Sequence, residues 1–295
     1  MKNKRILAAL LMMAAGLQML WAQTMTVRLN NNASQVYKLA DVAEITFSEE
    51  SIPQTDFQGA RRVFGNNLAK SFGEEGDKIY SLTYDENGFV TKVSVADHYT
   101  PDRKTEVLLT YGSVVTAETR VNGISRSRQT INLSKEGFFG NIEIVDDKGH
   151  TDRFEATYSS DGHIATCRWS DDDGDFELHE FTWQDGDIVR IRRTDDSGKT
   201  KITDIFYTSD AQPTPLENKG CVMELDNIFD VDVDDLGDML HYGGFLGFAT
   251  KHLPISVKSG SDLLVCTWTL NADGLPTRMA RTENGYTQYP LVWEW

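Results

Sequence analysis

Residues 82–95, LTYDENGFVTKVSV, contain the pattern that decides the fold. A Thr-Tyr pair leads into a short acidic turn that ends in Asn87-Gly88, and an amphipathic segment follows. Asn-Gly supplies the positive φ angles that a tight hairpin requires. Polar Lys92 then precedes apolar Val93, as expected for a strand with one buried face. The stretch therefore predicts an antiparallel β-hairpin.

The hairpin signature recurs along the chain. It is found at Thr157-Tyr158 to Gly162, Thr182-Trp183 to Gly186 and Thr267-Trp268 to Gly274, with a compressed copy at Thr110-Tyr111-Gly112. The fifth residue after each turn glycine is apolar in all four full copies: Val93, Cys167, Ile191 and Met279. The residue before it is polar: Lys92, Thr166, Arg190 and Arg278. Hairpins that share one apolar face predict an all-β fold, a long antiparallel meander that curls into an open barrel or half-barrel.

One region interrupts the hairpins. Residues 226–248 carry Leu236, Met239 and Leu240 at roughly helical spacing. Asp232 or Asp234 could cap the helix, and Gly243-Gly244 would end it. We expect one short helix near 234–243 that plugs or braces the sheet.

The N-terminus predicts export. Three basic residues, at positions 2, 4 and 5, precede an apolar run that ends before Ala22. Basic, apolar and small regions in that order are typical of a secretory signal peptide, here residues 1–22. Alternating residues in 23–48 indicate a small N-terminal β-element, and the acidic, Pro53-containing segment 49–60 is typical of a linker. Residues 61–295 then form the antiparallel β domain, in a periplasmic or extracellular protein.

Composition limits the partners. Without residues 1–22 the chain has 26 Lys+Arg (29 − 3) against 45 Asp+Glu, a net charge of −19. Such an acidic protein repels phosphate backbones, so we expect no nucleic-acid partner and no anionic lipid surface. Cys167, Cys221 and Cys266 allow one disulfide or none, and Cys167 occupies an apolar repeat position that favours a buried thiol.

The chain resembles a known family in the stretches RVFGNNLAKSFGEEGDKIYSLTYDENGFVTKVSV (62–95), LHYGGFLGFATKHLP (240–254) and WTLNADGLPTRMARTENGYTQYPLVWEW (268–295). These are similar to domain-of-unknown-function family 4595, which is described as having a porin-like fold. Residues 24–47 resemble the leader strands of secreted proteins from gut-associated Gram-negative bacteria. The resemblance implies the fold and carries no activity with it.

Two acidic groups are candidates for metal binding. Asp171, Asp173 and Asp175 lie on a tight glycine-bearing turn, where carboxylates could converge on Ca²⁺. A solvated hairpin turn is the alternative. Next to this turn, Asp175, Glu177 and His179 are two residues apart and share a face that could hold a transition metal or perform acid–base chemistry. Because Phe176 and Leu178 take the opposite face, we interpret the polar trio as the solvent-facing side.

The recurring aromatic residues are the candidates for ligand binding. Tyr84, Tyr158, Trp183 and Trp268 occupy equivalent positions of the repeat. If exposed, they could stack on sugar rings or on an extended ligand. If buried, they belong to the core, which is the favoured interpretation because aromatic residues suit half-buried pleated surfaces.

No enzyme signature is present: the sequence lacks GxSxG, HExxH, Walker and dinucleotide-binding motifs. We therefore favour a non-catalytic protein that binds a glycan, lipid or peptide on a curved sheet face. A carboxylate-dependent hydrolase is one alternative, since its paired acids leave no linear motif. A small outer-membrane barrel is the other, suggested by alternating Tyr289, Leu291, Trp293 and Trp295. Arg193 and Arg281 lie on the apolar face and make membrane insertion unfavourable.

Overall fold

The computed structural model describes residues 24–28, 34–38, 59–112, 114–231 and 236–295. The chain divides into two units, residues 1–49 and 50–295. In the first unit, β1 (Thr24–Arg28) pairs antiparallel with β2 (Ser34–Lys38). The predicted signal peptide and most of the predicted linker lie outside the described residues.

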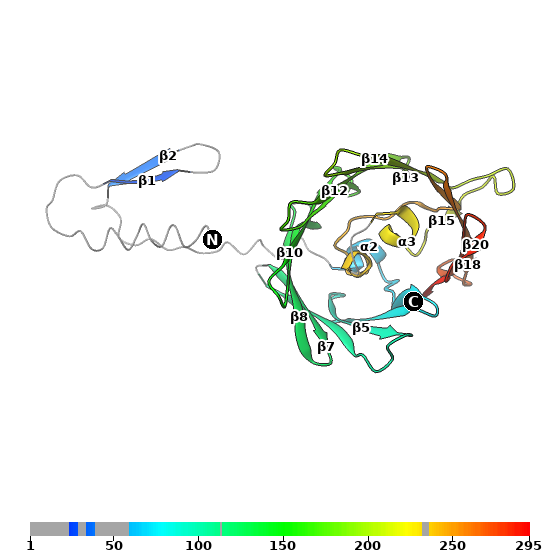
Figure 1. Cartoon of the computed structure of the whole chain (residues 1–295), viewed down its shortest axis with the longest axis horizontal. Helices are drawn as coiled ribbons and strands as arrows, with labels where there is room; N and C mark the ends of the chain where they lie inside the picture. Colours follow the sequence, from blue (N-terminus) through cyan, green and yellow to red (C-terminus); the bar gives the residue numbers. More distant parts are fainter. Residues whose placement is uncertain (1–23, 29–33, 39–58, 113, 232–235) are drawn as a thin grey trace. The chain divides into compact units, whose positions relative to one another are not determined.

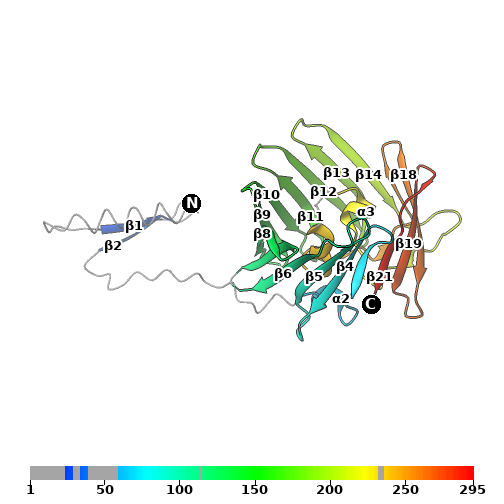
Figure 2. The ribbon, with the colours of Figure 1, turned by 60° about the horizontal axis from the view of Figure 1, so that its bottom comes forward.

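The second unit is a closed antiparallel barrel, seen along its axis in Figure 1 and tilted in Figure 2. Neighbouring strands follow chain order around the wall, apart from the step from β14 to β17. The strands are β3 (Ser71–Glu74), β4 (Lys78–Tyr84), β5 (Val90–Asp97), β6 (Thr105–Tyr111), β7 (Val115–Val121), β8 (Ile124–Leu133), β9 (Phe139–Asp146), β10 (Thr151–Tyr158), β11 (Ile164–Ser170), β12 (Phe176–Gln184), β13 (Asp187–Asp195), β14 (Thr200–Phe206), β17 (Ser256–Ser259), β18 (Asp262–Leu270), β19 (Pro276–Glu283), β20 (Tyr286–Thr287) and β21 (Leu291–Glu294).

The all-β meander is confirmed, and the sheet closes completely instead of stopping at the open barrel or half-barrel that the sequence suggested. Closure is made by the last strand, because β21 pairs antiparallel with β3 and places Trp293 opposite Phe72. The two strands lie more than 200 residues apart in the chain, so no local pattern could reveal their pairing. A closed barrel leaves no unpaired sheet edge.

The two-residue alternation is confirmed, and its apolar residues point into the barrel. Val93, Cys167, Ile191 and Met279 are all at most 2% exposed. The preceding polar residues point outward, where Arg190, for example, remains exposed. Each buried aliphatic side chain contributes roughly 1.5–3 kcal/mol relative to exposure, so the repeat supplies a ring of apolar contacts around the wall.

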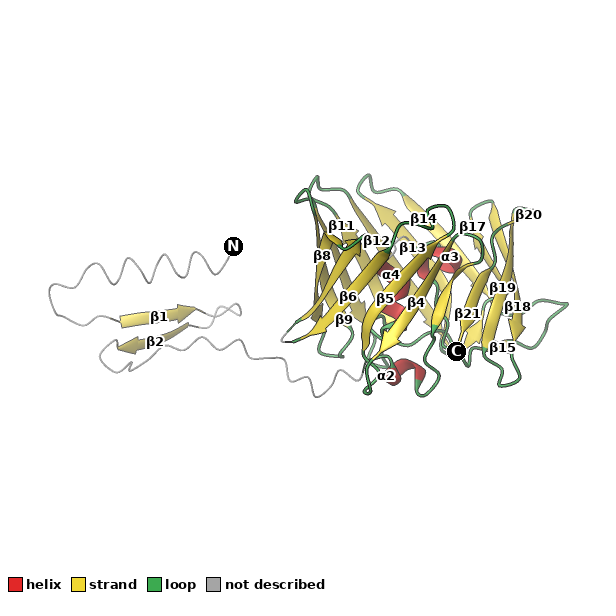
Figure 3. Cartoon of the chain, turned by 90° about the horizontal axis from the view of Figure 1, so that it is seen from below, coloured by secondary structure: helices red, strands yellow, loops and turns green. Residues whose placement is uncertain are grey.

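The barrel lumen is filled by a plug (Figure 1), which we define as residues 218–231 and 236–254. A barrel of about eight strands is just narrow enough for its own side chains to fill the lumen, and this wall contains many more. The plug contains α3 (Leu225–Phe229) and α4 (Leu236–Tyr242), with β15 (Leu216–Glu217) pairing with β16 (His252–Leu253) at its base. The helix expected near 234–243 is therefore confirmed as α4. Figure 3 shows both helices behind the strands, with α2 (Arg61–Phe64) at one end.

The three cysteines form no disulfide with one another in this structure. Cys167 and Cys266 are buried, Cys221 is half-buried, and all three are free. Burial raises the pKa of the Cys167 thiol to about 12, which makes it unreactive as a nucleophile. None of the helices in the described part of the chain has the length and hydrophobicity that crossing a lipid bilayer requires.

Candidate functional site

The two ends of the barrel differ. At the end that carries the repeated turns, which we call the closed end, the plug binds the turns through its backbone. Phe248 N–H donates to Gly162 O at 3.0 Å, and Lys251 N–H donates to Gly186 O at 2.8 Å. At Gly162 a Cβ atom would come within 2.8 Å of the Phe248 ring, so both this contact and a φ of +85° require glycine. The opposite end, which carries the turns at Gly149, Gly198 and Gly260, we call the open end.

A repeated hydrogen bond accompanies the repeated turn. An aromatic donor from the next hairpin reaches the carbonyl two residues after the turn glycine in four cases: Tyr111 to Val90, Trp183 to Ile164, Tyr207 to Ile188 and Trp295 to Pro276. Burial raises the pKa of the Tyr111 and Tyr207 hydroxyls well above the usual value, so both stay protonated and can donate these hydrogen bonds.

The four aromatic residues predicted as ligand contacts lie at this closed end. Trp183 takes part in the repeated bond and stacks on His163, with ring centroids 4.1 Å apart. Tyr84 donates to Ala69 O at 2.9 Å, and Trp268 donates to Pro254 O at 2.7 Å. Tyr158 donates to Phe245 O in the plug at 3.3 Å. All four pack against the core. Each of the four rings therefore bonds to a backbone carbonyl and packs against the core. A role in ligand binding stays a prediction.

The acidic turn predicted to bind calcium lies at the open end. The Oδ1 atom of Asp171 accepts backbone N–H bonds from Asp173, Gly174 and Asp175, each at 2.9–3.0 Å. The negative charges of Asp171, Asp196 and Asp173, together with partial burial of the carboxyl group, raise the pKa of Asp175. Among the residues that the structure describes, no three His, Cys, Asp or Glu side chains form a group suited to hold a metal ion. Calcium binding stays a prediction.

The structure corrects the interpretation of Asp175, Glu177 and His179 as the solvent-facing side of their strand. His179 is 1% exposed, and the Glu177 side chain is largely covered and pairs with Arg193. These groups face the lumen, whereas Phe176 and Leu178 face outward and remain half-exposed. The solvent-facing interpretation was wrong because His179 lies opposite Cys167, whose side chain points inward.

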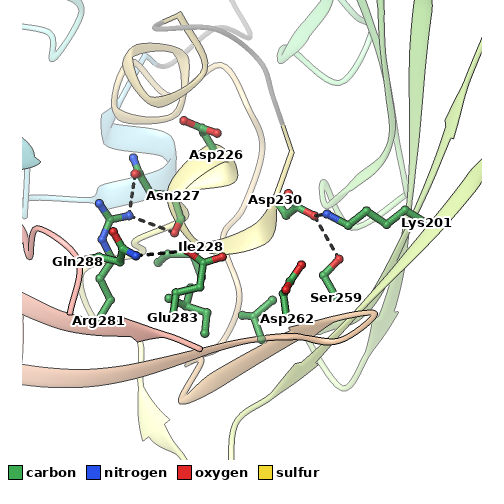
Figure 4. Close-up of a pocket in the computed structure, with 12 residues that line it drawn as sticks. Lys201, Asp226, Asn227, Ile228, Asp230, Ser259, Asp262, Arg281, Glu283 and Gln288 are labelled. Carbon is green, nitrogen blue, oxygen red and sulfur yellow. Dashed lines mark hydrogen bonds and ion pairs between the residues drawn. The ribbon is translucent and has the colours of Figure 1, made fainter. Parts of the chain in front are cut away.

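A polar cavity of about 230 Å³ opens at the open end, between α3 and the wall. We call it the α3 chamber (Figure 4). Strands β14, β17, β18 and β19 supply its wall, and Ile228, Val257 and Leu264 supply apolar surface. The other lining residues are polar or charged: Lys201, Asp226, Asn227, Asp230, Ser259, Asp262, Arg281, Glu283 and Gln288.

Both cations of the α3 chamber are held by partners. Lys201 Nζ lies 2.6 Å from Asp230 Oδ2, which also accepts a bond from Ser259 Oγ at 3.2 Å. Arg281 is buried; its Nη2 lies 2.7 Å from Glu74 Oε2, and its Nη1 donates to Asn227 Oδ1 at 2.8 Å. These bonds fix α3 to the wall.

In the part of the chain that the structure describes, two further carboxylates of the chamber have amide side chains as their partners. Asp262 Oδ1 accepts from Asn284 Nδ2 at 3.1 Å, and Glu283 Oε2 accepts from Gln288 Nε2 at 3.4 Å. Within the described ranges, no Lys or Arg pairs with either acid. The chamber therefore has more negative charge than its own cations compensate, and it can bind positive or hydrogen-donating groups.

Sequence reasoning did not single out this chamber. A signal for part of it was present, because Met279, Arg281 and Glu283 are two residues apart and so share the inward face. The alternation does not predict that α3 lines the chamber, because Asn227 and Arg281 are 54 residues apart in the chain.

Comparison with known proteins agrees with this architecture. The family model described as "Domain of unknown function (DUF4595) with porin-like fold" matches residues 82–278. None of the curated proteins matches the chain. Among solved structures, a porin-like protein from Bacteroides uniformis covers 76% of this chain and 93% of its own, with a TM-score of 0.57 and 15% identity, which is a likeness of fold alone. Because the family model covers well over half of its length, the chain belongs to the DUF4595 family of domains of unknown function with a porin-like fold.

Proposed function

We propose that this barrel is a non-catalytic binding protein of the bacterial envelope, and that its ligand carries a positively charged amino group that enters the α3 chamber. The observation that carries the proposal is the pair of carboxylates, Asp262 and Glu283, that line a lumen cavity without a cationic partner among the described residues. Of the ligand classes compatible with the sequence, a short peptide supplies such a group through its N-terminus or a lysine side chain.

The chamber favours an ammonium group for electrostatic reasons. Four carboxylates line it against two cations, and Glu74, outside the lining, pairs with one of the cations. At a partly exposed site a unit charge 4 Å away contributes on the order of 1–4 kcal/mol before desolvation. Val257 and Leu264 offer apolar surface for the aliphatic stem of a lysine side chain.

The outer surface of the wall supports a binding protein over a membrane pore. Ion pairs cross it between neighbouring strands: Arg190 to Asp204 at 2.7 Å, Arg192 to Glu180 at 3.3 Å and Lys92 to Glu106 at 3.5 Å. An Arg or Lys facing lipid at the bilayer midplane costs about 2–4 kcal/mol. The charges relevant to insertion are these outward residues, whereas Arg193 and Arg281 face the lumen.

The test is a binding titration with the tripeptide Ala-Lys-Ala. We expect saturable binding that weakens with added salt, and about tenfold weaker binding for Glu283→Gln or Asp262→Asn. Asp210→Asn removes the same charge from an exposed loop and is the matched control. The fully acetylated peptide, which lacks both amino groups, should not bind. Equal affinity for the free and acetylated peptides would refute the proposal.

A carboxylate-dependent hydrolase is the second candidate, because Asp226, Asp262 and Glu283 line one cavity. Paired carboxylates are the groups that glycoside hydrolysis requires. A panel of glycoside and ester substrates separates the two functions: binding alone predicts no turnover, whereas a hydrolase predicts turnover that Glu283→Gln abolishes.

Export is tested by cell fractionation. The basic and apolar N-terminal residues and the porin-like fold both point to the envelope. We expect the mature chain in the soluble fraction released by osmotic shock. Recovery only from detergent-extracted outer membranes would favour the barrel that inserts into lipid.

A further inference from the structure

A second cavity, of about 310 Å³, lies in another part of the lumen and shares no lining residue with the α3 chamber. We call it the α4 chamber, because Met239 of α4 lines it together with the inward side chains of β4 to β9. Its apolar surface comes from Val93, Val95, Val107 and Ile144. Apolar pockets of roughly 300–1,000 Å³ with a few convergent polar groups are typical small-molecule sites.

One wall of the α4 chamber carries an incompletely bonded amide. Gln129 is 5% exposed and lines the cavity. Its Nε2 donates to Thr119 Oγ1 and to Ser127 Oγ, both at 3.1 Å. Its Oε1 is buried and accepts no hydrogen bond from any residue in the described ranges. An unsatisfied buried acceptor costs about 1–3 kcal/mol, and a ligand donor that meets the amide after a small rotation of its terminal group would remove that cost.

Charge is confined to the mouth of the chamber. Lys78, Asp97 and Arg103 are its charged lining residues, and they belong to strand ends and a loop at the open end. Hydrogen bonds from Thr100 and Tyr99, together with the nearby positive charge of Lys78, lower the pKa of Asp97. Of the described residues, those that line the apolar depth of the cavity beyond Lys78, Asp97 and Arg103 are uncharged. A ligand that fills this depth must therefore be uncharged.

We propose that the α4 chamber binds small uncharged ring compounds that present one N–H or O–H donor to Gln129. The ring packs on Val93, Val107 and Met239, and the donor completes the hydrogen bonding of the buried amide. This site is independent of the α3 chamber and differs from it in ligand chemistry.

Indole and indene test the assignment, because they share one bicyclic shape and only indole carries an N–H donor. Binding is followed by NMR of methyl-labelled methionines, where Met239 reports the chamber and fully buried Met223 is the internal control. We expect indole to shift the Met239 signal and to bind about tenfold more tightly than indene.

Two variants in the chamber separate shape from hydrogen bonding. Gln129→Leu should abolish the preference for indole, and Val95→Trp, which fills the cavity, should abolish binding of both probes. Glu283→Gln should leave indole binding unchanged, and Val95→Trp should leave Ala-Lys-Ala binding unchanged, so the two chambers are tested separately. A folded protein whose Met239 signal does not respond to indole would overturn the proposal. An indole preference that survives in Gln129→Leu would overturn it as well.

Discussion

The closed and open ends of the barrel are built from the same strands, yet they differ in packing and in chemistry. At the closed end the plug lies against the turns, and aromatic donors such as Trp183 and Tyr207 bind backbone carbonyls. At the open end, charged residues line two chambers, and Tyr99 and Tyr286 are 63% and 76% exposed.

The difference separates stability from binding. Buried side chains and backbone hydrogen bonds at the closed end and in the plug hold the barrel together, whereas solvated charges at the open end contribute little to the free energy of unfolding. A ligand can therefore occupy the open end without disturbing the contacts on which the fold depends. Four predictions test this division, from the largest expected effect to the smallest.

Removing a plug aromatic should have the largest effect. Phe245 is fully buried, and Phe245→Ala should lower the free energy of unfolding by about 3–5 kcal/mol because it leaves a cavity. Urea denaturation measures the change. The matched open-end variant, Tyr286→Ala, should change stability by less than about 0.5 kcal/mol. Comparable losses in the two variants would contradict the division.

Acid should destabilise the protein through His241 of the plug. Burial lowers the pKa of this imidazole to about 4, from 6.5. Between these values the unfolded chain binds the proton and the folded chain does not, so stability is lost as the pH falls from 6.5 towards 4, by up to about 3 kcal/mol. Thermal unfolding across this window measures the loss. His241→Gln should flatten the dependence, and His150→Gln, at an exposed residue, should not.

Loss of one aromatic hydrogen-bond donor should lower the free energy of unfolding more at the closed end, where the donor packs against the core, than at the exposed open end. Trp183→Phe removes the bond to Ile164 O and should cost about 1–2 kcal/mol. Tyr99→Phe removes a hydroxyl that shares a bond with Tyr289 at the exposed open end, and should cost less than about 0.5 kcal/mol. Chemical denaturation of both variants gives the comparison, which fails if Trp183→Phe is neutral.

The Lys201–Asp230 pair should affect binding more than stability. Both side chains are about 40% exposed, so Lys201→Met should cost less than about 1 kcal/mol. The variant leaves Asp230 without its cation, which should tighten binding of Ala-Lys-Ala about threefold. Calorimetric titration measures the affinity, and weaker binding would show that the lysine itself contacts the ligand.

Local patterns were enough to predict the wall. The turn glycines and the alternation through Val93, Cys167, Ile191 and Met279 predicted the hairpins, and all four residues are buried. The same alternation was misread at His179, because its neighbours Phe176 and Leu178 are apolar yet face outward. Hydrophobicity alone gave the wrong face there, whereas the register with Cys167 gives the right one.

The sequence by itself determined where the chain turns, which residues alternate, and that a short helix interrupts the hairpins, because each depends on neighbours within a few residues. Only the tertiary structure decided that the sheet closes through β21 and β3, that the apolar face surrounds a plug, and that two chambers remain beside it. Those features bring together residues far apart in the chain, such as Arg281 with Glu74 in an ion pair, and Gln129 with Met239 in the lining of one cavity. Their contacts arise from barrel closure and plug packing, which leave no periodic trace in the sequence.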